Sequence, residues 1–171
     1  SILQIKETPI MEIANYGRNF TKDTGKEVYP AWFGEGNIST DKLIYNETIN
    51  ALKAGETFYT YQNGIPEVRE EISKYMNQMF DVKTSAFQHS IVNGGMLGIK
   101  ICCEIILEKG DEVAIVGPVW PNIRSSVVLR EAIINEVSLD FDNTWTLDLN
   151  KLLNAITDKT KLVFINSPNN P

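Results

Sequence analysis

The chain has 171 residues, of which 43% are hydrophobic and 22% are charged, and these fractions are typical of a folded globular domain. The net charge of −6 argues against a nucleic-acid partner, because the basic residues are scattered along the chain and outnumbered. No run approaches the roughly 20 apolar residues that a membrane-spanning helix needs, and the first residues lack the layout of a signal peptide. A soluble cytoplasmic protein is therefore expected.

The two cysteines, Cys102 and Cys103, are neighbours within an apolar run. Adjacent cysteines in a helix do not suit a structural disulfide, and two thiolates are too few for a zinc cage. Free cysteine commonly behaves as a small, buried, apolar residue. The sequence therefore predicts two buried free thiols in a reducing compartment and no metal site.

Residues 1–38 are the least regular part of the sequence. Ile10, Ile13 and Ala14 have the spacing of a short helix face. Residues that favour loops follow: Gly17, Gly25, Pro30, Gly34 and Gly36. This segment is predicted to be an irregular N-terminal arm and connector, not an independent domain.

Two helices with clear ends are predicted next. The first is capped by one of residues 39–41, carries apolar residues on a broad face and ends before Gly55. An aromatic stretch, 58–61, and an Asn63-Gly64 turn lead to the second helix. It begins at Pro66, because the missing N–H of proline costs nothing at the first helical position. Its apolar face comprises Val68, Ile72, Tyr75, Met76 and Met79.

From residue 90 onward, short strands alternate with helices. The predicted strands are 90–92, 112–116, 133–137 and 161–165. The predicted helices run from Met96 to Glu108, from near Pro121, and after an Asp148 cap. Strands of about five residues joined by helical segments of about 10–15 residues are typical of βαβ units, so the sequence predicts an α/β fold with a mostly parallel sheet. The helix 96–108 is apolar around nearly its whole circumference and is expected to be buried.

The first candidate site is the Asn93-Gly94-Gly95-Met96 turn between a predicted strand and a predicted helix. Two glycines there expose backbone N–H groups at the positive end of the helix, which suits a phosphate. The glycine spacing does not fit the G-x-G-x-x-G turn of dinucleotide-binding domains, and no P-loop lysine follows. A tight structural turn that needs small residues is the alternative interpretation.

Two more candidate sites follow predicted strands, at the edge where open α/β sheets bind ligands. In the segment 117–121 two prolines fix the backbone around Trp120, whose ring can stack on a flat ligand. The alternative there is an aromatic side chain that plugs the top of the sheet. The segment 166–171, Asn-Ser-Pro-Asn-Asn-Pro, offers neutral donors and acceptors on a stiff loop, and its alternative is an ordinary polar loop.

Taken together, these motifs resemble those of the fold-type I, class I and II aminotransferases, which use pyridoxal 5'-phosphate (PLP). The resemblance covers roughly residues 33–171 and keeps the order of the family's motifs. The matching stretches are Trp32–Gly36, Tyr59–Arg69, Asn93–Gly95, Lys109–Val113, Pro118–Trp120, Thr160–Lys161 and Asn166–Pro171. The resemblance implies a partial three-layer α/β/α large domain. Residues 1–38 would be the N-terminal arm and small-domain segment, and residues 39–171 the N-terminal part of the large PLP-binding domain.

The resemblance also implies which residues bind the cofactor. Gly94, Gly95 and Met96 would give backbone N–H groups to the PLP phosphate. Trp120 would stack on the pyridine ring, and Asn170 would hydrogen-bond the phenolic oxygen of that ring. These residues would supply the phosphate clamp, one face of the ring sandwich and the contact to the phenolic oxygen.

Further roles are implied outside these three contacts. Tyr59 would reach across a homodimer interface to the phosphate bound by the other subunit, and Gly34 would lie near the substrate carboxylate. Gly36 stands where proline is usual in the family. Some proline bonds of the family's site loops are cis, so Gly117–Pro118 and Asn170–Pro171 are candidates for that form.

Other residues that the family's reaction needs lie beyond Pro171 in such enzymes. They are the Schiff-base lysine, the aspartate that keeps the ring nitrogen protonated and the arginine that holds the substrate carboxylate. We therefore expect the parent protein to move amino groups between amino acids and 2-keto acids, and the 171-residue chain alone to be inactive. Two alternatives stay open: a PLP-dependent lyase or synthase of the same fold, and a non-catalytic module that binds a phosphate ligand or dimerises.

Overall fold

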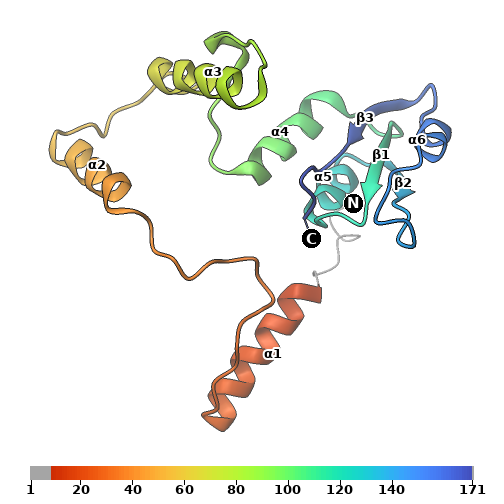
Figure 1. Ribbon diagram of the computed structural model, residues 1–171, viewed down its shortest axis with the longest axis horizontal. Helices are drawn as coiled ribbons and strands as arrows, with labels where there is room; N and C mark the ends of the chain where they lie inside the picture. The colour runs from red at the N-terminus through yellow and green to blue at the C-terminus, as the bar shows by residue number, and fades with distance from the viewer. Residues whose placement is uncertain (1–8, 171) are drawn as a thin grey trace. The chain divides into compact units, whose positions relative to one another are not determined.

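The computed structural model describes residues 9–170 of the chain (Figure 1). These residues belong to two compact units, one within residues 1–29 and 93–171 and the other formed by residues 30–92. The predicted arm, 1–38, and the predicted large-domain segment, 39–171, refer to the domains of a complete enzyme. That division stays a prediction.

A three-stranded parallel sheet forms the centre of the first unit. β1 (Glu112–Gly117) lies between β2 (Ile133–Ser138) and β3 (Thr160–Phe164). α5 (Asn122–Leu129) connects β1 to β2, and α6 (Leu149–Ala155) connects β2 to β3. The three carboxyl ends therefore lie at one edge of the sheet, and the predicted α/β fold with a parallel sheet is confirmed.

Helices cover both faces of this sheet. The buried cluster on one face joins β1 to α5 and to α4 (Gly95–Ile106), and it comprises Cys103, Leu107, Val113, Ile115, Val119, Ile123 and Val127. On the other face, the side-chain amide of Asn135 donates to the carbonyl oxygen of Ala155 in α6 at 3.1 Å. Alternate residues of a strand point to opposite faces, so the sheet is the middle layer of an α/β/α arrangement.

α4 is less buried than its sequence predicts. Cys103 is its one buried residue in the part of the chain that the structure describes, whereas Cys102 is exposed and Ile105 is 78% exposed. An apolar helix is buried on all sides only where neighbours surround it, and α5 packs along one side of α4. The predictions of a fully buried helix and of a buried Cys102 are therefore wrong for the described residues.

The second unit contains α2 (Lys42–Lys53), α3 (Pro66–Phe80) and a short 3-10 helix, η2 (Ala86–Gln88). Asp41 caps α2, because its carboxylate accepts a hydrogen bond from the main-chain N–H of Leu43 at 2.8 Å. Pro66 is the first residue of α3. Both predicted helix starts are confirmed.

Residues 90–92 do not form the strand that the sequence predicts. The main-chain N–H of Ile91 instead donates to the carbonyl oxygen of Asn63 at 3.1 Å, and the Ile91 side chain is 40% exposed. Gly64, with a φ of +92°, lies so close to Ile91 that a Cβ at Gly64 would overlap the Ile91 side chain. The short apolar run therefore packs on a turn and does not join a sheet.

α1 (Pro9–Thr24) is longer than the short helix face predicted for this part of the sequence. Gly17, which was expected in a loop, lies inside the helix and is buried. Glycine in a helix interior costs only about 1 kcal/mol relative to alanine, so one glycine does not end a helix that other residues favour. Gly25, with a φ of +69°, lies in the loop after the helix, as predicted.

Candidate cofactor site

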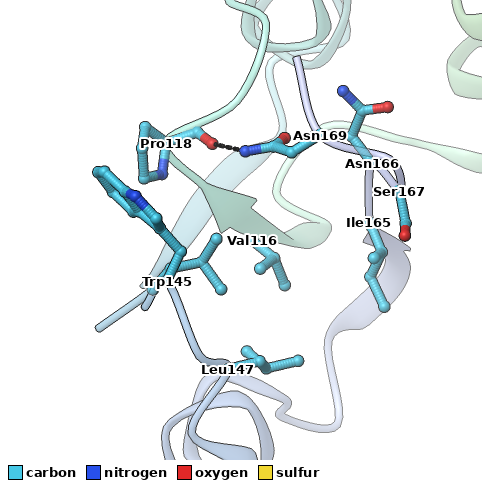
Figure 2. A pocket seen from close by; sticks show the side chains of 9 residues that line it. Val116, Pro118, Trp145, Leu147, Ile165, Asn166, Ser167 and Asn169 are labelled. Carbon is cyan, nitrogen blue, oxygen red and sulfur yellow. Dashed lines mark hydrogen bonds between the residues drawn. The ribbon is translucent and has the colours of Figure 1, made fainter. Parts of the chain in front are cut away.

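Two hydrogen bonds join the loops that follow β1 and β3. The main-chain N–H of Trp120 donates to the carbonyl oxygen of Asn170 at 2.7 Å. The side-chain amide of Asn169 donates to the carbonyl oxygen of Pro118 at 2.9 Å, across 51 residues of sequence (Figure 2). Because β1 and β3 are parallel neighbours, their loops leave the same edge of the sheet. The structure thus brings together Trp120 and Asn170, the two predicted ring contacts.

Trp120 is anchored to the core of the first unit. Its partly buried side chain packs against the buried cluster. The Gly117–Pro118 bond before it is cis, as predicted, and Ser167–Pro168 in the other loop is cis as well. The Asn170–Pro171 candidate lies outside the described residues.

The glycine turn leads into the amino end of α4. Gly94 has a φ of +93°, a conformation that glycine adopts without strain. The N–H of Gly98 donates to the carbonyl oxygen of Gly94 at 3.3 Å, so the N–H groups of Gly95 and Met96 precede the first intrahelical donor. Among the described residues no side chain caps this end, and a Cβ at Gly95 would meet no atom within 4 Å. An open and uncapped helix start of this kind fits a phosphate group.

Gly34 and Tyr59 belong to the second unit. A Cβ at Gly34 would meet no atom within 4 Å, so the backbone there is open. The Tyr59 side chain is fully exposed, and its neighbours Phe58 and Tyr61 are exposed as well. Their roles toward substrate and partner subunit stay predictions.

A cavity of about 530 Å³ lies beside the joined loops. Figure 2 shows its mostly apolar wall, which is formed by Val116, Pro118, Leu139, Trp145, Leu147, Ile165, Asn166, Ser167 and Asn169. Trp145 reaches the cavity from a turn in which its φ is +61°, and it packs edge-to-face on Phe141 with ring centroids 4.9 Å apart. Its part in the cavity wall depends on how this turn folds back, which no local sequence pattern specifies.

An ion pair lies beside the loop after β1. Arg124 and Glu136 line a smaller cavity of about 240 Å³ together with Gly117 and Pro118. The hydrogen bond from Arg124 holds the pKa of the Glu136 carboxyl below its ordinary value, so this carboxylate stays ionised and is neutralised by its partner. Among residues 9–170 there is no group of three or more His, Cys, Asp or Glu side chains arranged to hold a metal ion.

Known proteins with similar sequences are aminotransferases. The chain is 32% identical over 167 residues to a probable aspartate aminotransferase of Methanocaldococcus jannaschii, with 98% of this chain and 42% of that protein covered. It is 30% identical over 171 residues to the aspartate aminotransferase of Thermotoga maritima, with 98% and 45% covered. The chain therefore spans less than half the length of these relatives.

Solved structures of the same group have the same fold. The aspartate aminotransferase from Rhizobium meliloti matches with a TM-score of 0.92 at 27% identity, over 99% of this chain and 42% of that one. The Thermotoga maritima enzyme matches with a TM-score of 0.93 at 29% identity, over 99% and 45%. The family model for aminotransferase class I and II matches residues 31–171. The chain thus belongs to the class I and II aminotransferases, and its sheet is part of a fold-type I domain.

Proposed function

We propose that the whole protein is a PLP-dependent aminotransferase, which transfers an amino group between an amino acid and a 2-keto acid. The observation that carries this proposal is the 2.7 Å bond between Trp120 and Asn170, because it sets a stacking ring beside an amide at the carboxyl edge of a parallel sheet. Family membership supports the reaction class. The chain spans 42–45% of its relatives, so the activity is proposed for the whole protein.

Each residue of the site has a separate task in this proposal. PLP, when bound, supplies an electron sink for an amino acid that loses its α-proton. Trp120 covers one face of the pyridine ring, and its anchoring in the core limits the tilt of that ring. The Asn170 amide donates to the phenolic oxygen and favours its deprotonated form. The N–H groups of Gly95 and Met96 bind the phosphate, whose charge the amino end of α4 favours.

We assign two contacts of the second unit to a homodimer and its substrate. Tyr59 donates to the phosphate of the partner subunit, and Gly34 lies near the substrate carboxylate. The fully exposed Tyr59 and its exposed aromatic neighbours support a subunit contact, since aromatic side chains are enriched in such interfaces. The open backbone at Gly34 leaves room for a substrate group.

We place the protein in the cytoplasm. The described helices include none that is long and apolar enough to cross a membrane. Cys102 and Cys103 are free thiols, and free thiols persist in reducing compartments. The two free thiols support the proposed location.

The test uses the full-length protein purified in the presence of PLP. The expected results are a visible absorbance that borohydride reduction removes, PLP attached to one lysine in the peptide map, and turnover of amino-acid and 2-keto-acid pairs. Elimination or condensation without amino transfer would overturn the proposal in favour of a lyase or synthase. The absence of any lysine adduct would instead favour a binding module.

A further inference from the structure

We infer that Asn169 is a positioning residue that fixes Asn170 relative to Trp120, an inference that rests on the proposed function. The Asn169 amide donates to the Pro118 carbonyl oxygen at 2.9 Å (Figure 2). Pro118 stands two residues before Trp120, and Asn169 directly precedes Asn170. The bond therefore ties the two loops together immediately beside the two ring contacts.

The two hydrogen bonds between the loops differ in whether they depend on a particular side chain. The main-chain bond from Trp120 to Asn170, 2.7 Å long, forms with any side chain at position 169. One hydrogen bond leaves the loop, which is otherwise held only by its covalent link to β3, some freedom to rotate, and the Asn170 side chain turns with it. The second bond, between Asn169 and Pro118, removes that rotation and fixes the direction in which the Asn170 amide leaves the backbone.

The bond requires a donor at position 169. A carbonyl oxygen only accepts hydrogen bonds, and the asparagine amide supplies the N–H. Aspartate has nearly the same shape, but it would face the Pro118 carbonyl with a second acceptor. Asn169 and Pro118 are both exposed, so the bond adds little to global stability and its effect is confined to the loops.

The test compares Asn169→Ala and Asn169→Asp in the full-length protein, with Asn154→Ala as the control. Asn154 is an exposed asparagine of α6 and lies outside both loops. Both Asn169 variants should bind PLP about threefold to tenfold more weakly than the wild type. The pH midpoint of the visible absorbance of bound PLP should also rise, because a displaced Asn170 amide stabilises the deprotonated phenolic oxygen less. Thermal unfolding midpoints of the Asn169 variants should match the wild type, and so should PLP binding by the Asn154→Ala variant.

Several results would overturn the inference. Wild-type PLP affinity and pH midpoint in both Asn169 variants would remove the positioning role and leave the proposed function intact. Wild-type PLP affinity in Asn169→Asp but not in Asn169→Ala would show that the volume of the side chain matters and that its N–H donor does not. A loss of thermal stability that accounts for the weaker binding would make Asn169 merely structural. Absence of PLP binding by the wild type would overturn the proposed function itself, and the inference with it.

Discussion

Arg130 closes the carboxyl end of α4 by donating from Nε and from Nη2 to the carbonyl oxygen of Leu107, at 3.0 and 2.9 Å. Its Nη1 also donates to Glu104 at 3.2 Å. The carbonyl groups at the end of a helix have no intrahelical donor, and Leu107 is buried away from water. A side chain from the turn between α5 and β2 therefore supplies the missing donors and holds α4 to that turn.

Replacing Arg130 should destabilise the fold. Arg130→Ala is expected to lower the free energy of unfolding by about 2–3 kcal/mol, because the buried Leu107 carbonyl loses both donors. Arg130→Lys should recover part of that loss. Urea denaturation measures the difference, and Lys109→Ala is the control, since Lys109 pairs with Glu131 while 80% exposed and should change stability little. Equal losses in Arg130→Ala and Lys109→Ala would contradict this account.

Gly64 is a position that only glycine fits. Gly64→Ala should cost at least about 2 kcal/mol, because a Cβ there both overlaps the Ile91 side chain and requires a left-handed φ. Gly55→Ala separates the two causes, since Gly55 has a φ of +80° but open space around it. Its expected loss is about 1 kcal/mol. Denaturant midpoints of the two variants are compared, and an equal loss would exclude a role for the contact with Ile91.

Burial of the Cys103 thiol should make stability depend on pH. Burial raises the pKa of this thiol above its ordinary value of 9.0, with smaller contributions from Cys102 and Glu104. The unfolded thiol ionises first, so stability that is present below pH 9.0 is lost as the pH rises toward the folded pKa. The stability advantage of the wild type over Cys103→Ala should therefore shrink above about pH 9. Cys102→Ala, which changes an exposed thiol, is the control. Curves of unfolding free energy against pH that run parallel for the wild type and Cys103→Ala would contradict the prediction.

Trp120 should determine how tightly PLP is held. Trp120→Ala is expected to weaken PLP binding about tenfold or more, because a stacked ring contributes about 1–3 kcal/mol. Trp120→Phe keeps an aromatic face and should retain most of the affinity. Equilibrium dialysis of the full-length protein measures both. Unchanged affinity in Trp120→Ala would leave this side chain as a plug at the top of the sheet.

The 171-residue chain by itself should show no transaminase turnover. The resemblance implies that the lysine which binds PLP covalently lies beyond Pro171, and without it the proton transfers of the reaction lack their base. Assays with amino-acid and 2-keto-acid pairs, run against a blank without protein, test this expectation. Turnover above the blank would refute it.

Helix starts were predictable because their signals are local. Asp41 and Asp148 each accept hydrogen bonds from N–H groups two residues on, and Pro66 stands at a first helical position. A cap involves neighbours in sequence, so the pattern alone identifies it. Trp120 and the loop 166–171 were likewise predictable as candidate site residues, because each directly follows a predicted strand.

Features that depend on distant partners were not predictable in the same way. The apolar run 90–92 contacts a turn formed around Asn63, and the exposure of Ile105 depends on which elements reach α4. The bond from Asn169 to Pro118 requires the parallel register of β1 and β3, which no local pattern specifies. Sequence reasoning could have found it only by asking which loop a donor at position 169 would face.

The pairing of β3 with β1 also sets when Trp120 and Asn170 come together during synthesis. β2 follows β1 in the chain and can pair with it before β3 has been made, whereas Trp120 meets Asn170 only once β3 occupies the opposite side of β1. A ligand that bridges the two loops binds only chains in which this pairing is in place. Cofactor supply would then influence how much newly made protein reaches its native state, in addition to how much of it is active.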